Sequence, residues 1–207
     1  MSGENDDKGA EPTAPMRDAG HGGTALLIVD MIADFTADAR LDLAADAERV
    51  AAAITGLRER IDALDAPVIY VNDHFGEWHS DRAKLIEKAM ANRPGPLCDI
   101  APRTTDYFVI KPQFSGFYST NLPVLLPKLG ISRLILTGVS TDMCVLFTAA
   151  DAHMRDYRLW VPDDATASID AQRSRAALEI MREGFDAETR GSRDWNSIKF
   201  CGHRRRE

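Results

Sequence analysis

The chain has 207 residues, of which 44% are hydrophobic and 28% are charged, and its formal net charge is −7. This length suits one α/β domain with a sizeable core and is short for two domains. The negative charge argues against nucleic acid or an anionic membrane surface as the main partner. No apolar stretch of the sequence is long enough to span a bilayer.

The cysteines and the N-terminal segment bear on the cellular compartment. Cys98, Cys144 and Cys201 are widely spaced and odd in number, a pattern that suits a reducing environment and not a disulfide framework. Residues 1–23 are polar, rich in Gly, Asp, Glu and Pro, and lack the apolar core of a signal peptide. We therefore expect a flexible leader at residues 1–23 and a cytoplasmic protein.

Short apolar runs alternate with amphipathic stretches along the body of the chain. The runs predict strands, and apolar residues spaced by three and four predict helices. The expected strands cover residues 24–29, 68–71, 107–110, 133–139 and 158–162, with a final edge strand at 185–189. The expected helices cover residues 43–64, 80–90, 121–129, 141–154 and 169–182, and Gly184 is expected to stop the last of them.

Strands that alternate with helices predict a parallel sheet with right-handed crossovers and helices on both faces. We expect one domain at residues 24–190 with a three-layer α/β/α, Rossmann-like fold and a mostly parallel sheet of about six strands. Residues 191–207 are expected to form a C-terminal tail. Residues 30–35, after the first strand, read Asp-Met-Ile-Ala-Asp-Phe and carry no Gly-rich phosphate fingerprint, so no dinucleotide cofactor is expected.

Three chemically reactive residues stand at the ends of predicted strands. Asp30 follows the first strand, Lys111 follows the third, and Cys144 lies just past the fourth. In open α/β sheets the ligand crevice lies outside the carboxyl ends of the strands, so these side chains are expected to meet there. A carboxylate can accept the proton of a thiol, and a nearby ammonium can stabilise the thiolate. Each residue alone has a simpler explanation, as a turn former, a solvated cation or a small buried apolar residue.

Cys144 is predicted to lie in the first turn of the helix that follows the fourth strand. Either Thr141 or Asp142 is placed to cap that helix. Backbone N–H groups and the positive end of the helix dipole stabilise an anion at such a position. We therefore expect the pKa of the Cys144 thiol to be lowered, so that it alkylates near pH 7 faster than Cys98 or Cys201.

Three motifs in order give the chain a resemblance to a known family. They read Leu-Ile-Val-Asp-Met at 27–31 with Phe35; Ile-Lys at 110–111 with Ser-Gly-Phe at 115–117 and Thr-Asn-Leu at 120–122; and Leu-Thr-Gly-Val-Ser-Thr-Asp-Met-Cys-Val at 136–145. With these motifs the chain resembles the isochorismatase-like cysteine hydrolases, which include nicotinamidases, N-carbamoyl amidohydrolases and isochorismatases. The resemblance covers roughly residues 24–190 and implies the isochorismatase-like hydrolase fold.

The resemblance implies a catalytic triad of Asp30, Lys111 and Cys144. It also implies a cis peptide bond between Val139 and Ser140, with the backbone N–H groups of Ser140 and Cys144 forming an oxyanion hole. The implied reaction is hydrolysis of an amide or N-carbamoyl C–N bond of a small molecule through a thioester on Cys144, with Asp30 carrying the proton. The family also implies a homo-oligomer, either a dimer or a tetramer, and no cofactor.

Nicotinamidases of this family bind a divalent metal with an Asp-x-His pattern after the second strand. In this chain Phe75 stands where that His would be, and His74 is adjacent to Asp73. A zinc site made by Asp73, His74 and His79 would have suitable ligand types, but the altered pattern makes us expect no metal. The same departure argues against nicotinamide as the substrate.

Four aromatic residues are expected in loops just beyond the strand ends, namely Phe35, Trp78, Phe114 and Phe117. For any one of them, packing of its loop on the body of the protein is the simpler explanation. As a group they are expected to wall a small, partly apolar substrate pocket.

Two other functions fit the same fold. Isochorismatase cleaves a vinyl ether, and members of that branch often lack the nucleophilic cysteine. A catalytically silent protein would use the pocket to hold a ligand or a partner. The presence of Cys144 favours thiol chemistry.

Overall fold

The computed structural model of the protein describes residues 22–35, 43–76, 78, 81–90, 96–198 and 200. Most of the expected leader, His79 and Cys201 lie outside this part of the chain. Among the helices of the described residues, none is both long and apolar enough to cross a membrane.

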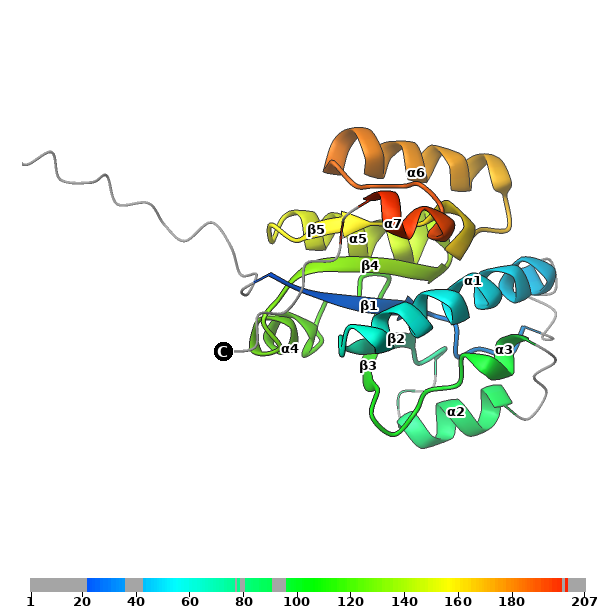
Figure 1. Cartoon of the computed structure of the whole chain (residues 1–207). Helices are drawn as coiled ribbons and strands as arrows, with labels where there is room; N and C mark the ends of the chain where they lie inside the picture. The colour runs from blue at the N-terminus through cyan, green and yellow to red at the C-terminus, as the bar shows by residue number, and fades with distance from the viewer. Residues whose placement is uncertain are drawn as a thin grey trace, which may run out of the picture.

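A six-stranded sheet forms the centre of the fold, and its strand pairings are parallel. The strands are β1 (Gly23–Val29), β2 (Val68–Asp73), β3 (Tyr107–Lys111), β4 (Ile131–Val139), β5 (Arg158–Trp160) and β6 (Thr166–Ala167). Their order is β3-β2-β1-β4-β5, with β6 paired to the end of β4, and Figure 1 shows β5 toward the top of the sheet and β3 toward the bottom. The predicted α/β fold with a mostly parallel sheet is confirmed.

Helices connect the strands and cover both faces of the sheet. The longer ones are α1 (Ala44–Ala63), α2 (Arg82–Met90), α4 (Leu122–Lys128), α5 (Leu146–His153) and α6 (Ala171–Phe185). The shorter ones are α3 (Pro96–Asp99), η2 (Thr141–Val145), η3 (Asp163–Ala165), η4 (Ser192–Asp194) and α7 (Trp195–Ile198). In α1 the residues Val50, Ile54, Leu57 and Ile61 are buried, because their spacing by three and four places them on one face.

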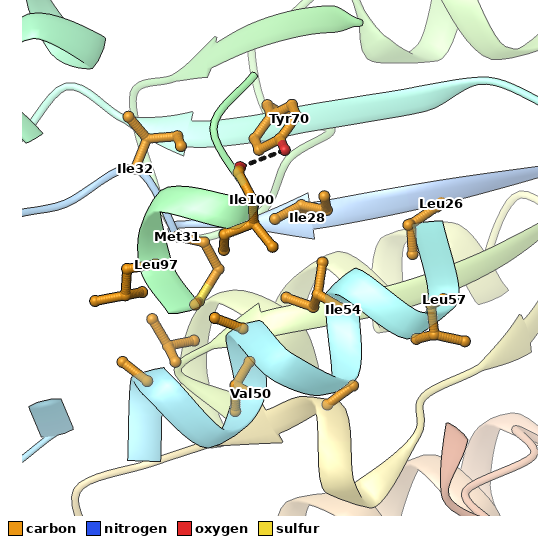
Figure 2. Packing of buried hydrophobic residues seen from close by; sticks show 14 of the residues in the cluster. Leu26, Ile28, Met31, Ile32, Val50, Ile54, Leu57, Tyr70, Leu97 and Ile100 are labelled. Atoms are coloured by element: carbon orange, nitrogen blue, oxygen red, sulfur yellow. Dashed lines mark hydrogen bonds between the residues drawn. The ribbon is translucent and has the colours of Figure 1, made fainter. Parts of the chain in front are cut away.

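Alternate residues of β1 pack into two separate hydrophobic cores. Leu26 and Ile28 lie in the core that contains α1, whereas Leu27 and Val29 lie in the core formed with α4, α5 and α6. Successive side chains of a strand point to opposite faces, so a strand covered on both faces needs a continuous apolar run. Figure 2 shows the first of these cores, in which side chains of α1 point toward those of β1.

The prediction of a final edge strand at residues 185–189 is wrong. Phe185 still belongs to α6, and Glu188 makes only an isolated bridge, to Trp160. The sixth strand is β6 instead. A strand of two residues is too short to show the alternation or the apolar run by which a strand is predicted.

Helix α6 also ends later than predicted. Gly184 lies inside the helix, which ends at Phe185 and is followed by the cap residue Asp186, whose backbone is left-handed with a φ of 52°. Asp adopts this conformation more readily than most residues because its short side chain can bond locally. Beyond it, η4 and α7 occupy part of the expected tail, and Trp195 of α7 packs against Trp160.

The carboxyl ends of β1, β2, β3 and β4 lie side by side at one edge of the sheet. Val29 pairs with Val71 of β2 and with Gly138 of β4, and Asp73 pairs with Lys111 of β3. Gly138 has a φ of 107°, and a Cβ on it would lie 2.0 Å from the carbonyl oxygen of Val29. Glycine is therefore required here, and its close approach brings together the residues that follow β1 and β4.

Candidate active site

Four reactive side chains from four neighbouring strand ends meet at this edge of the sheet. Asp30 follows β1, Asp73 ends β2, Lys111 ends β3, and Cys144 lies in η2 after β4. The Nζ of Lys111 lies 2.9 Å from Asp30 Oδ2, 3.4 Å from Asp73 Oδ2 and 3.4 Å from Cys144 Sγ. The structure thus brings the three residues singled out in the sequence into one cluster, and it adds Asp73 to them.

Asp30 is held in place by the strand next to it. Its backbone is left-handed, with a φ of 52°, and its Oδ1 accepts the backbone N–H of Asp73 at 2.7 Å. The side-chain amide of Asn72 binds both the N–H and the carbonyl of Ile32, at 3.0 and 3.1 Å, and so fixes the loop after β1. Burial raises the pKa of Asp30, outweighing the Lys111 charge and the hydrogen bonds that lower it.

Lys111 is fully buried and links the other members of the cluster. Its Nζ also donates to the carbonyl oxygen of Gln113 at 3.2 Å. Burial alone would lower the pKa of Lys111, but the charge and hydrogen bond of Asp30 and the charge of Asp73 raise it above the usual value. The ammonium is therefore the stable form of Lys111, and it is the single cation that Asp30, Asp73 and Cys144 share.

Cys144 lies in the π-helical turn η2 and not in an α-helical first turn. The expected side-chain cap from Thr141 or Asp142 is wrong, because the residue before the turn is Ser140 and it makes no side-chain capping bond. The carbonyl of Ser140 instead accepts the N–H groups of both Met143 and Val145, each at 3.1 Å. Backbone hydrogen bonds therefore stabilise the start of this wider turn, and α5 begins only after it.

The expectation of a lowered thiol pKa is also wrong. Burial and then the charge of Asp30 raise the pKa of Cys144 to about 12, and the opposing effect of Lys111 does not compensate. The thiol is therefore neutral at rest and hydrogen-bonded to the Asp30 carboxylate. A sequence shows the neighbouring helix terminus, but it does not show how deeply the sulfur is buried.

These contacts define what the cluster can do. The thiol of Cys144 is hydrogen-bonded to the carboxylate of Asp30. Because the pKa of Asp30 is raised, this carboxylate is a stronger base than that of an ordinary aspartate. Lys111 lies against both atoms between which the proton would move. The arrangement can hand the thiol proton to Asp30 and leave a thiolate beside an ammonium.

The peptide bond between Val139 and Ser140 is cis. It joins the end of β4 to the turn that carries Cys144. The oxyanion hole assigned to the N–H groups of Ser140 and Cys144 stays a prediction.

The four aromatic residues expected at the pocket lie in different surroundings. Phe35 and Phe117 are each 3% exposed and pack in the two separate cores, whereas Trp78 and Phe114 are 73% and 45% exposed. The ring of Phe114 contacts Phe147, with centroids 5.6 Å apart. The role of these rings as substrate contacts stays a prediction, and the buried pair is already engaged in core packing.

Phe147 is a candidate that the sequence analysis misses. It is half exposed, lies three residues after Cys144, and contacts Phe114. The signal in the sequence is its position one helical turn beyond the thiol, where i and i+3 side chains are neighbours.

Asp73 and His74 do not fit the metal site considered from the sequence. Asp73 Oδ1 accepts the N–H of Phe75 at 2.6 Å and Oδ2 faces Lys111, so both carboxylate oxygens are engaged. His74 Nδ1 accepts the N–H of Gly76 at 3.0 Å, and its Nε2 is buried. Within the described residues no three His, Cys, Asp or Glu side chains are grouped as metal ligands.

Comparisons with known proteins agree with the fold. YaaI, an isochorismatase family protein of Bacillus subtilis (strain 168), is 40% identical over 165 residues, covering 79% of this chain and 91% of YaaI. The ureidoacrylate amidohydrolase RutB of Serratia proteamaculans (strain 568) is 30% identical over 193 residues, covering 78% of this chain and 77% of RutB. The crystal structure of N-carbamoylsarcosine amidase from Thermoplasma acidophilum has a TM-score of 0.64 at 28% identity, covering 82% of this chain and 96% of that one.

The family model of the isochorismatase domain matches residues 24–192, which is most of the chain. The chain belongs to the isochorismatase family, a class of hydrolases.

Proposed function

We propose that the protein is a cysteine hydrolase that cleaves an amide or N-carbamoyl C–N bond of a small molecule through a thioester on Cys144. One observation carries the proposal: a thiol, a carboxylate and an ammonium from three strand ends lie within contact distance in a buried cluster. These are the three groups that a cysteine nucleophile needs for activation.

The first half-reaction forms the thioester. The thiol of Cys144 gives its proton to the Asp30 carboxylate, and the sulfur attacks the substrate carbonyl carbon, whose π electrons move onto the oxygen. The N–H groups of Ser140 and Cys144 stabilise that oxyanion. When the oxyanion collapses, the C–N bond breaks and the leaving nitrogen takes the proton from Asp30.

The second half-reaction releases the acid. A water molecule gives a proton to Asp30 and its oxygen attacks the thioester carbonyl, so that the C–S bond breaks. The departing thiolate of Cys144 then recovers the proton from Asp30. Throughout both steps the Lys111 ammonium, 2.9 Å from Asp30 and 3.4 Å from the sulfur, stabilises whichever of the two is anionic.

The names of the relatives support this class of substrate. RutB is named for the hydrolysis of ureidoacrylate, and the Thermoplasma enzyme is named as an amidase of N-carbamoylsarcosine. Both names describe C–N bonds of small molecules. A vinyl ether reaction needs no thiol, whereas in this chain Cys144 contacts both Asp30 and Lys111. The homo-oligomeric state and the cytoplasmic location stay predictions.

A substrate screen tests the proposal. Primary amides, N-carbamoyl compounds and isochorismate are offered to the wild type, to Cys144→Ala and to the matched control Cys98→Ala, whose cysteine is exposed. We expect an amide or N-carbamoyl compound to turn over in the wild type and the control but not in Cys144→Ala. Mass spectrometry of a rapidly quenched reaction should find the acyl group on Cys144.

Two outcomes would overturn the proposal. Isochorismate turnover that survives Cys144→Ala would assign the vinyl ether reaction. A ligand that binds tightly while no compound turns over would assign a silent binding protein.

A further inference from the structure

Asp142, two residues before the nucleophile, has no part in the mechanism above, yet its polar atoms are fully engaged. Its Oδ1 accepts the hydroxyl of Ser168 at 2.6 Å, and its Oδ2 lies 2.8 Å from Nη2 of Arg173. Its backbone N–H donates to the oxygen of the same Ser168 at 3.2 Å. Asp142 and Ser168 therefore bind each other twice, across a gap of 26 residues in the chain.

Ser168 is itself fixed by the sheet. It follows β6, whose two residues pair with Gly138 and Val139 at the end of β4, so the segment is aligned with the residues that precede the nucleophile turn. Its side chain is buried. On its other side Asp170 caps α6 by accepting the N–H groups of Gln172 and Arg173 at 2.7 and 3.2 Å. Asp142 is thus bound to a segment that is held at both ends.

The neighbouring residue adds a second attachment. The hydroxyl of Thr141 bonds to that of Ser174 in α6 at 3.0 Å, and Thr141 is fully buried. The nucleophile turn is therefore attached to the β6–α6 segment through Thr141 and Asp142, while Cys144 faces Lys111 and Asp30.

We propose that Asp142 is a positioning residue for the nucleophile: by binding Ser168 and Arg173 it holds η2 so that the Cys144 sulfur stays in contact with Asp30 and Lys111. The kinetic part of this inference rests on the proposed function, whereas the thiol-labelling part does not. Placement matters here because the thiol passes its proton only through direct contact with Asp30. A displacement of about 1 Å can lower a rate by roughly 100-fold.

The three contacts are expected to matter unequally. The Arg173 side chain is 62% exposed, and an exposed ion pair contributes little. The bonds to Ser168 are shielded from water and fix direction as well as distance. We therefore expect Asp142→Ala and Ser168→Ala to have large effects, and Arg173→Gln a small one. In Asp142→Asn the amide oxygen can still accept the Ser168 hydroxyl, so its effect should be intermediate.

The test compares these variants with Asp151→Asn as the matched control. Asp151 lies in α5, after Cys144 in the chain. It pairs with Arg155 and not with a residue of β6 or α6. For the best substrate of the screen, we expect kcat to fall about 10- to 100-fold in Asp142→Ala and Ser168→Ala with KM within about twofold. A general loss of folded protein would reduce the active fraction equally in all assays and would show in the unfolding midpoint, which is measured for each variant.

The rate at which the Cys144 thiol is labelled can be measured without a substrate. Iodoacetamide modification of Cys144 is followed by peptide mass spectrometry as a function of pH. If the turn is released, the sulfur leaves its buried site beside Asp30, so Cys144 should label at least about tenfold faster at pH 8 than in the wild type. Asp151→Asn should label as the wild type does.

The proposal fails if Asp142→Ala and Ser168→Ala both match Asp151→Asn in labelling rate and in kcat. Ser168→Ala removes the hydroxyl that makes both bonds to Asp142, so it tests the same link if Asp142→Ala does not fold. If no compound of the screen turns over, the labelling rates of Cys144 in the variants alone show whether Asp142 and Ser168 hold the nucleophile in place.

Discussion

Two buried charge clusters among the described residues differ in composition. In one of them, Arg58 pairs with Asp106 at 2.8 Å and also donates to the hydroxyl of Tyr70. That hydroxyl donates to the carbonyl of Ile100, the bond drawn in Figure 2. That cluster has one cation, one carboxylate and neutral partners, and it attaches the loop before β3 to α1.

The cluster at the strand ends has one cation for two carboxylates and a thiol. Lys111 faces Asp30, Asp73 and Cys144, and the pKa values of Asp30, Lys111 and Cys144 are all raised. A balanced buried pair is a stable end state, whereas a cluster with an excess of anionic groups favours the uptake of a proton. The difference fits a structural role for the first cluster and supports the catalytic role that we propose for the second.

The largest expected effect removes the base of the second cluster. Asp30→Asn should lower kcat/KM by at least about 1,000-fold, because the amide cannot accept the thiol proton. The substitution also removes the nearest anionic partner of the buried Lys111, so the unfolding midpoint should fall, although Asp73 remains 3.4 Å from Nζ. Activity within tenfold of the wild type would remove Asp30 from the mechanism, and circular dichroism checks that the variant is folded.

A substitution in the first cluster should lower the stability of the protein and leave its activity unchanged. Arg58→Met leaves Asp106 buried without its partner, and breaking such a pair costs about 3–5 kcal/mol of unfolding free energy. The kcat of the protein that remains folded should be unchanged. Urea unfolding measures the loss, and the double variant Arg58→Met with Asp106→Leu should recover most of it. A fall in kcat without a fall in stability would show that the two clusters are not separate in function.

A smaller effect concerns the resting state of the nucleophile. Because the pKa of Cys144 is about 12, iodoacetamide at pH 8 should modify the exposed Cys98 before Cys144. The thiolate fraction of Cys144 should keep rising as the pH rises toward that value. In Asp30→Asn the opposing charge is gone, so the pKa should fall and labelling of Cys144 should speed up by about tenfold. Preferential labelling of Cys144 in the wild type would contradict the neutral thiol.

The sequence was sufficient for five of the six strands and for the meeting of Asp30, Lys111 and Cys144, and the reasons are visible in particular elements. Runs such as residues 24–29 are continuous and apolar because β1 is covered on both faces. Once the strands are parallel, their carboxyl ends must share one edge, so Asp30, Lys111 and the region of Cys144 come together.

The remaining features depend on three-dimensional contacts that no local pattern encodes. β6 has two residues and is defined by its partner β4. The raised pKa of Cys144 follows from burial first, and burial comes from elements distant in sequence. Asp73 looked like a metal ligand in the sequence, and only the register that pairs it with Lys111 shows where its carboxylate lies.

The smallest expected effect concerns the exposed rings beside the second cluster. Phe114 follows Gln113, whose carbonyl accepts a hydrogen bond from Lys111 Nζ, and Phe147 lies one helical turn after Cys144. The two rings, with centroids 5.6 Å apart, therefore belong to segments that contact the cluster. A flat ring on the substrate could pack on this pair, and such contacts contribute about 0.5–1.5 kcal/mol. Phe147→Ala should therefore raise KM about 2- to 10-fold for amides that carry a ring and leave kcat unchanged.

The control for this prediction is Met154→Ala, which removes a more exposed apolar side chain just past the far end of α5. KM for amides without a ring should change in neither variant, because a small substrate does not reach the rings. If Phe147→Ala alters KM equally for both kinds of amide, or for neither, the ring pair is not a substrate contact. A change in molecular mass by light scattering in Phe147→Ala would then assign the pair to an interface between copies of the chain, since an exposed aromatic pair is also what an oligomer buries.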